Sequence, residues 1–135
     1  MADGPTRGLL DTSVIIDLEK LAAADLPSEL AISSITLAEL AAGPHATAEA
    51  NERARRQDRL QRTEALFDPL PFDLGAARAY GRIYAAVTAS GRTARGARAV
   101  DLLIAAVALA NALPLYTRNP TDFRRLDGLV DVIGI

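Results

Sequence analysis

The sequence predicts a single α/β domain in which a short central parallel β-sheet is flanked by α-helices. Short apolar runs alternate with longer helical patterns along the chain of 135 residues, as in βαβ units with parallel strands. No repeat, linker or low-complexity segment divides the chain, and this length is typical of one domain. We therefore expect one domain over residues 7–135 and a flexible N-terminal tail over residues 1–6.

The first half of the chain contains two strand patterns and three helix patterns. Each strand pattern is a short apolar run, which is typical of a buried strand in a parallel sheet. Ser33 or Ser34 can cap the second helix, and Gly43-Pro44 provides its stop signal. The third helix is polar and rich in alanine and arginine. In chain order, the expected elements are a strand at 7–10, a helix over 12–20, a strand at 30–33, a helix ending at Ala42 and a helix over 47–67.

The second half predicts three strands and two helices. Asp73 can cap the first of these helices. The second helix is apolar nearly all round and is therefore expected to be buried. A loop rich in glycine and arginine joins the two. In chain order, the expected elements are a strand at 70–72, a helix after Asp73, a loop over 90–97, a helix over 100–111 and strands at 114–117 and 130–133.

The composition limits the chemistry that the chain can perform. Cysteine is absent, which excludes disulfides, thiolate zinc sites and a cysteine nucleophile, and His45 is the only histidine. Any metal site must therefore be built from oxygen ligands, which suit Mg²⁺ or Mn²⁺. Residues 1–7 lack a signal-peptide core, and the longest apolar run, 102–110, is too short to span a bilayer. These features predict a cytoplasmic protein with no membrane partner.

Four acidic residues stand at predicted edges of strands and helices, in mostly apolar surroundings. Asp11 directly follows the first strand, Asp122 lies in a turn after a later strand, and Glu39 and Asp101 lie early in helices. A carboxylate among apolar residues is costly unless it is paired or binds a metal. Because ligands of open α/β sheets bind beyond the carboxyl ends of the strands, the four acids suggest one shared divalent-cation centre.

Each of these acids also has a simpler structural explanation. Asp11 and Asp101 can cap helices, Glu39 can be an exposed helical residue, and Asp122 can be an ordinary turn residue. Independent caps and turns give no reason for all four acids to occur at the same rim of a sheet. The shared centre is therefore the interpretation that we pursue.

Four segments of the chain resemble the motifs of PIN-domain ribonucleases. The first is LLDTSVIID at residues 9–17, and ITLAEL, DLLIAA and TRNPTDF follow at residues 35–40, 101–106 and 117–123. Each motif alone is weak, but four in register are more specific. Their order and spacing, together with the chain length, resemble those of the VapC toxins of bacterial toxin–antitoxin pairs over residues 7–135.

The resemblance implies a Mg²⁺- or Mn²⁺-dependent endoribonuclease, often directed at structured RNA such as tRNA, that a cognate VapB-like antitoxin inhibits. By position, Asp11 and Asp101 are the expected metal ligands, Glu39 completes the acidic set, and Asp122 is the fourth acid. Relatives can carry an acid where this chain has Asn119, so Asn119 and Asp122 compete for the fourth role. Hydroxyl groups expected to support the site belong to Thr12, Ser13 and Thr117.

Arginine supplies nearly all of the positive charge, although the formal net charge is −2. That net charge does not favour nucleic-acid binding, because domains that bind nucleic acid often have a high pI. One arginine group, between residues 53 and 62, alternates with acids and is interpreted as an ion-paired, solvated helix face. The other has few acidic neighbours and is expected to contact RNA phosphate; it consists of Arg92, Arg95 and Arg98.

Two other classes of function remain open. A phosphatase acting on a small phosphoester can use the same acids, but it would want a second aspartate at the position of Ser13. A non-cleaving binding module of the same fold can use the acids to capture arginine from a partner.

Assembly is predicted from one apolar stripe and from the resemblance. The stripe exceeds what a short sheet covers and predicts a homodimer; it consists of Tyr80, Ile83, Tyr84 and Val87. The resemblance agrees with a homodimer and implies a heterotetramer or larger assembly with the antitoxin.

Overall fold

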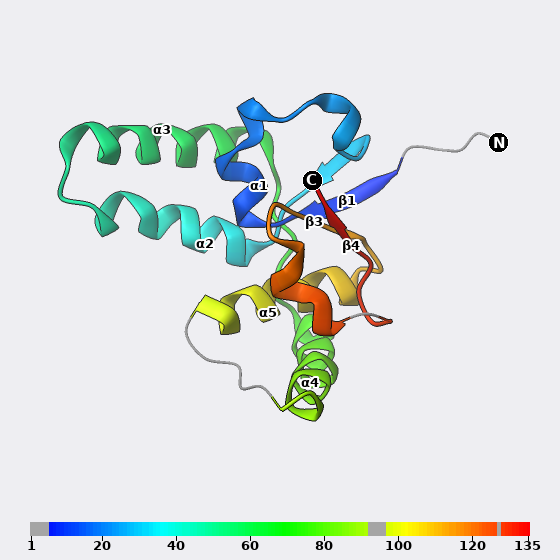
Figure 1. Cartoon of the computed structure of the whole chain (residues 1–135). Coiled ribbons are helices and arrows are strands. Elements are labelled where there is room, and N and C mark those ends of the chain that lie inside the picture. The colour runs from blue at the N-terminus through cyan, green and yellow to red at the C-terminus, as the bar shows by residue number, and fades with distance from the viewer. Residues whose placement is uncertain (1–5, 92–96, 127) are drawn as a thin grey trace.

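The computed structural model describes residues 6–91, 97–126 and 128–135. Its centre is a parallel four-stranded sheet with the strand order β2-β1-β3-β4 (Figure 1). The predicted α/β fold with a short parallel sheet is therefore confirmed. All but one residue of the predicted flexible tail lie outside the described part of the chain. The strands are β1 (Arg7–Leu10), β2 (Glu29–Ala31), β3 (Leu115–Thr117) and β4 (Val132–Gly134).

One predicted strand, at residues 70–72, is wrong. Leu70 makes only an isolated parallel bridge to Ser33, in which its backbone N–H donates to the carbonyl of Ile32. Pro69 and Pro71 flank Leu70, and neither has a backbone N–H with which to extend a ladder. The apolar run is therefore a single point of attachment to the sheet rather than a strand.

In the described part of the chain, five α-helices connect and cover the strands, and side chains that the sequence offered as possible caps do cap three of them. Asp11 accepts a hydrogen bond from the backbone of α1, Ser33 caps α2, and Asp73 caps α4. The third helix is capped by Glu49, which accepts from two backbone N–H groups of its first turn. The helices are α1 (Thr12–Ile16), α2 (Ser34–Ala42), α3 (Ala50–Leu66), α4 (Leu74–Ala89) and α5 (Ala97–Ala110).

Several predicted helix limits need correction. The helix expected over 12–20 ends at Ile16 and resumes as a 3-10 turn at Leu18–Lys20. The α-helix ends before Gly43-Pro44, as predicted, but these two residues begin a 3-10 turn at Gly43–Ala46. Proline is tolerated there because it lies in the first turn of the new helix. The last helix begins at Ala97 rather than at residue 100.

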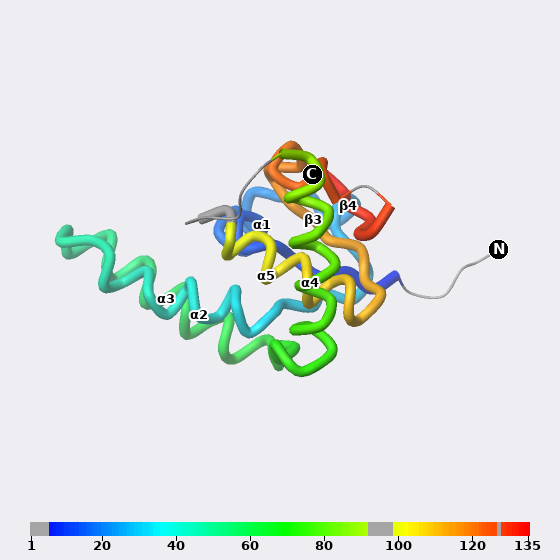
Figure 2. Tube along the Cα trace, turned by 90° about the horizontal axis from the view of Figure 1, so that it is seen from below, coloured from blue at the N-terminus to red at the C-terminus, as the bar shows by residue number. Residues whose placement is uncertain are grey.

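Each face of the sheet packs against its own group of helices. Adjacent residues of a strand point to opposite faces, so they belong to different cores. Leu9 and Leu115 belong to a core shared with α4 and α5. Leu10 and Tyr116 belong to a second core, shared with α1, α2 and α3. Figures 1 and 2 show the same division, with the α2–α3 hairpin extending away from the sheet and α4 packed along α5.

Most of the apolar stripe that predicted a dimer packs against the core of the chain itself. Ile83 and Val87 are buried in the core with α5, whereas Tyr84 stays 44% exposed. The homodimer therefore stays a prediction with a weaker basis than the sequence suggested. Separately, no helix in the described part of the chain is long and apolar enough to cross a membrane.

The strand order places a topological switch between β1 and β3. The chain leaves β1 for β2 on one side and later returns to β3 on the other side. The crevice at such a switch lies outside the carboxyl ends of the two strands, where ligands of open α/β folds bind. Asp11 and Thr117 occupy these two strand ends.

Candidate acidic site at the carboxyl edge of the sheet

Asp11 is the one buried acid among the described residues. It joins β1 to α1, and its backbone N–H donates to the carbonyl of Tyr116 in β3 at 2.9 Å. The residue as a whole is only 5% exposed. The residue is therefore fixed at the switch between the two central strands, as its place in the sequence predicted.

Three donors hold the Asp11 carboxylate. The backbone N–H of Thr12 donates to Oδ1 at 2.9 Å, and the hydroxyls of Ser13 and Thr117 donate to Oδ2, each at 2.8 Å. Asp11 is thus a helix cap, as its simpler explanation required. A cap needs only one of these bonds, so the two additional hydroxyls fix the orientation of the carboxylate beyond what capping requires.

Thr12 connects Asp11 to Glu39. The Thr12 hydroxyl donates to Glu39 Oε1 at 2.5 Å and lies 3.0 Å from the hydroxyl of Thr36. Glu39 is exposed and, with Thr12, lines a cavity of about 360 Å³ between α1, α2 and α3. Two of the predicted acids, Asp11 and Glu39, are therefore brought together through one intervening threonine.

The site is a cluster of carboxylate and hydroxyl oxygens. Among the described residues, neither Asp11 nor Glu39 forms an ion pair with a lysine or arginine side chain. Each buried polar side chain in the described part of the chain has a hydrogen-bond partner. Carboxylate and hydroxyl oxygens are the donor set that suits a hard divalent cation.

Asp101 lies inside α5 rather than at its start. The helix begins four residues earlier, at Ala97, so the explanation of Asp101 as a helix cap is wrong. Its side chain is half-buried. A half-buried acid within a largely buried helix needs a polar or ionic partner, and the role of Asp101 as a metal ligand stays a prediction.

The fourth acidic position is divided between Asn119 and Asp122. The backbone N–H of Asn119 donates to the Thr117 hydroxyl at 3.0 Å, and this hydroxyl is also the donor to Asp11. Asp122 is exposed and lies in the 3-10 segment Pro120–Leu126, where its backbone N–H donates to the carbonyl of Asn119 at 3.0 Å. The Asn119 backbone is therefore connected to the site, and the choice between the two side chains stays open.

The predicted shared metal centre is not assembled as a cluster. Within residues 6–91, 97–126 and 128–135, no three acidic or histidine side chains are gathered closely enough to hold a metal ion. The centre therefore stays a prediction. The same holds for the predicted phosphate contacts, because Arg92, Arg95 and the side chain of Arg98 lie outside the described part of the chain.

Two residues next to the site were not singled out from the sequence. Thr36 contributes a fully buried hydroxyl, and its position three residues before Glu39 places both on one helix face. Arg118 donates its backbone N–H to Ser13 Oγ at 3.1 Å and its guanidinium to Asp17 at 3.2 Å. Arg118 follows Thr117 directly, so its place in the fourth motif was the available signal.

The fold and the site define a class of α/β protein whose acidic centre lies at the switch point of a small parallel sheet. A family model described as the PIN domain matches residues 8–129. This match covers most of the chain, and the chain belongs to the PIN-domain family.

Curated relatives agree with this assignment. The chain is 41% identical to a protein named Ribonuclease VapC5 from Mycobacterium tuberculosis, over 98% of this chain and 96% of that protein. It is 32% identical to Ribonuclease VapC1 from Rickettsia felis, over 90% of this chain and 91% of that protein.

Solved structures give the same family. The chain resembles VapBC-5 from M. tuberculosis, described as a member of the VapBC family of toxin-antitoxin systems. The TM-score is 0.81 at 38% identity, over 97% of this chain and 100% of that chain. It also resembles a DNA-bound VapBC from Salmonella typhimurium, with a TM-score of 0.73 at 26% identity, over 94% of this chain and 96% of that chain. The predicted resemblance to VapC-type PIN domains is confirmed.

Proposed function

We propose that this protein is a divalent-metal-dependent endoribonuclease toxin that hydrolyses RNA phosphodiester bonds. The observation that carries the proposal is the Asp11 carboxylate, which is buried at the switch point and fixed by hydroxyls. No lysine or arginine pairs with it in the described part of the chain. The relatives named as VapC ribonucleases support the choice of RNA as substrate.

The proposed metal ligands are Asp11 and Asp101, with Mg²⁺ as the expected ion and Mn²⁺ as a substitute. When bound, such an ion activates a water molecule and stabilises the negative charge that develops on the phosphate. Glu39 and one of Asn119 and Asp122 complete the set of oxygen ligands. Oxygen donors alone are present, so the donor set fits these hard cations.

The neighbouring hydroxyls orient the acids. Ser13 and Thr117 hold one Asp11 oxygen from two sides, which fixes the direction of the carboxylate. Thr12 holds one oxygen of Glu39 and leaves the other oxygen for a ligand or a water molecule. A site whose charged groups are fixed before substrate binds needs little reorganisation during the reaction.

The proposed partner is a VapB-like antitoxin that inhibits the enzyme, in an assembly that contains a homodimer of this chain. The similar structures are described as VapBC toxin–antitoxin systems, which supports this partner. A neighbouring small gene for a DNA-binding protein is expected. Purification of the two proteins after joint expression, followed by light scattering, measures whether they form a heterotetramer or a larger complex.

A cleavage assay tests the proposed activity. Purified protein is incubated with total RNA and with p-nitrophenyl phosphate, each with Mg²⁺, with Mn²⁺ and with EDTA. We expect RNA fragments only with a divalent ion and no release of p-nitrophenol. Release of p-nitrophenol without RNA cleavage would favour the phosphatase, and inactivity on both substrates with retained RNA binding would favour the non-cleaving module.

A further inference from the structure

Helix α3 carries a group of arginines, most of which are bound within the chain. Arg55 and Arg56 form ion pairs with Glu52 at 2.7 and 2.8 Å. Arg53 donates to the backbone carbonyls at residues 44 and 47, at 3.2 and 3.0 Å. These three side chains therefore connect α3 to itself and to the preceding turn, as the ion-paired interpretation of this cluster predicted.

Arg62 is bound in the same way. It pairs with Asp58 at 3.0 Å and with Glu19, which lies across the surface in the 3-10 turn after α1. The hydrogen bond and the charge of Arg62 lower the pKa of the Glu19 carboxyl, and Arg59 contributes only the smallest part. Glu19 is thus neutralised mainly by Arg62.

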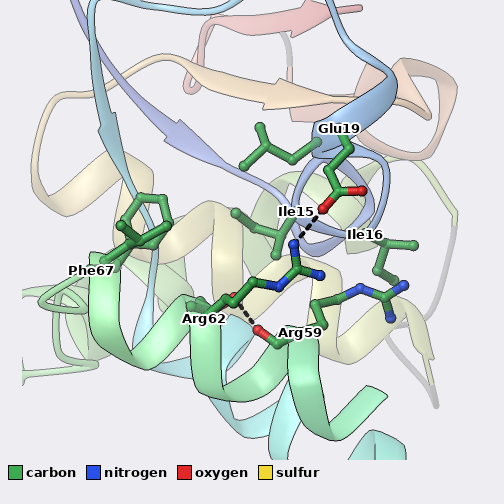
Figure 3. Close-up of a pocket in the computed structure, with 9 residues that line it drawn as sticks. Ile15, Ile16, Glu19, Arg59, Arg62 and Phe67 are labelled. Carbon is green, nitrogen blue, oxygen red and sulfur yellow. Dashed lines mark hydrogen bonds and ion pairs between the residues drawn. The ribbon is translucent and has the colours of Figure 1, made fainter. Parts of the chain in front are cut away.

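Arg59 differs from these arginines. Its side chain is half-buried, yet it forms no ion pair with any residue in the described part of the chain. Figure 3 shows Arg62 turned toward Glu19, whereas Arg59 extends past Ile16. Among the described residues, no carboxylate therefore forms an ion pair with the guanidinium of Arg59.

The position of Arg59 connects its charge to the acidic site. It lines the cavity of about 360 Å³ that Thr12 and Glu39 also line. It also lines a smaller cavity of about 120 Å³, beside Ile15 and Phe67. Arg59 therefore lies where two neighbouring cavities meet, on the side of the acidic site that faces α3.

We propose that Arg59 is a substrate-positioning residue that binds a phosphate of the RNA strand next to the phosphate being cleaved. This inference rests on the proposed nuclease function. A guanidinium binds phosphate through two parallel hydrogen bonds, which fixes position as well as supplying charge. An acidic site also repels a polyanion, so a fixed cation at its rim directs the strand into the cavity.

The matched control is Arg55, which lies one helical turn away on α3. Its side chain is 64% exposed, it is paired with Glu52, and it lines neither cavity. Arg59→Gln removes the charge and keeps most of the side-chain length, whereas Arg59→Lys keeps the charge. Arg55→Gln removes a charge of the same kind from the same helix.

The experiment measures binding of a short, fluorescein-labelled single-stranded RNA of mixed sequence by anisotropy, in EDTA, over a series of salt concentrations. Arg59→Gln should flatten the slope of log K against log salt by about 0.7, the value for one phosphate contact in a single strand. Arg59→Lys and Arg55→Gln should keep the wild-type slope. In cleavage assays with Mg²⁺, Arg59→Gln should raise KM more than it lowers kcat.

A wild-type slope for Arg59→Gln, or an equal loss for Arg55→Gln, overturns the inference while leaving the nuclease proposal intact. Unchanged RNA binding together with weaker capture of the co-expressed antitoxin also overturns it, because Arg59 then belongs to the protein interface. If the wild-type protein does not cleave RNA with Mg²⁺, the nuclease proposal fails, and this inference fails with it.

Discussion

The acidic site and the surface of α3 use the same types of charged residue in opposite ways. At the site, Asp11 is buried, and its carboxylate is held by a backbone N–H and two hydroxyls. On α3, Glu52 is bound by two arginines, and its side chain is 31% exposed. The first arrangement fixes a negative charge without neutralising it, and the second neutralises the charge locally.

This difference separates the proposed functional cluster around Asp11 from the solvated surface of α3. Exposed ion pairs contribute little to stability and do not attract a further ion strongly, because their charges are already compensated. A buried carboxylate without a basic partner is a candidate ligand for an external cation, because buried charges are usually paired or bound to a metal. The acids of the Asp11 site and of α3 cannot be told apart by sequence alone. The hydrogen-bond and ion-pair partners of each acid in the structure distinguish the two regions.

The largest expected effect is on catalysis. Asp101→Asn keeps the size of the side chain and removes one proposed ligand charge, so the rate of RNA cleavage should fall at least a hundredfold. This corresponds to about 2.7 kcal/mol of barrier. Asp58→Asn, which changes an exposed acid of α3, is the matched control and should keep the wild-type rate. Near wild-type activity of Asp101→Asn at saturating Mg²⁺ would remove Asp101 from the ligand set.

The second prediction concerns binding of the ion itself. Mg²⁺ at a hundredfold excess over its Kd should raise the free energy of unfolding of the wild-type protein by about 2.7 kcal/mol. Asp101→Asn should lose most of this increase, whereas Glu52→Gln should retain it, because Glu52 belongs to the neutralised surface. Thermal melts in EDTA and in Mg²⁺ measure the difference. An equal response of all three proteins would contradict a metal centre that contains Asp101.

The third prediction tests the buried hydroxyls. Thr117 is fully buried, and its hydroxyl donates to Asp11 and accepts from the backbone N–H of Asn119. Thr117→Val keeps the shape but removes one of the donors to Asp11 and the side-chain acceptor of the Asn119 N–H, so the free energy of unfolding should fall by about 1–3 kcal/mol. Thr88→Val, an exposed threonine whose hydroxyl contacts carbonyls of α4, should change it by less than about 0.5 kcal/mol. Denaturant titration of both variants checks the contrast.

Much of the fold could be predicted from the sequence, because the apolar runs and capping residues agree with the way the elements pack. The strand at 7–10 and the caps Ser33 and Asp73 follow from apolar runs and side-chain oxygens at the right positions. The prediction of a strand at 70–72 was wrong, because an apolar run does not determine which strand it pairs with. The prolines on either side of Leu70 also lack the backbone N–H groups that would extend the pairing. Local patterns therefore located segments better than they located hydrogen bonds between segments.

The site could be predicted only in part, because local patterns do not determine contacts between distant segments. The order of the motifs placed Asp11 at the edge of the sheet, and this position is correct. The hydroxyl network that joins Asp11 to Thr117 spans 106 positions of the chain, and no local pattern specifies such a contact. Arg59 was grouped with its neighbours on α3 because helical spacing suggests ion pairs but does not determine which side chains form them.

The smallest expected effect belongs to the surface of α3 and concerns pH. Hydrogen bonds from Arg56 and then Arg55 lower the pKa of Glu52 below its ordinary value of 4.5. Because the folded pKa is lower than the unfolded one, the stabilisation is present above pH 4.5 and is lost as the pH falls through the folded pKa. Glu52→Gln should therefore melt below wild type at neutral pH, and the two melting temperatures should converge as the pH falls from 4.5 through the folded pKa of Glu52.

Salt separates this surface from the buried site. Screening weakens interactions between exposed charges, so the difference between Glu52→Gln and wild type should also shrink at about 1 M salt. The loss caused by Thr117→Val should persist at the same salt concentration, because its hydroxyl bonds are buried and short. Melts of both variants at low and high salt measure the two responses together. If Thr117→Val is as sensitive to salt as Glu52→Gln, the Asp11 cluster is held by exposed electrostatics, and the contrast between the two regions is wrong.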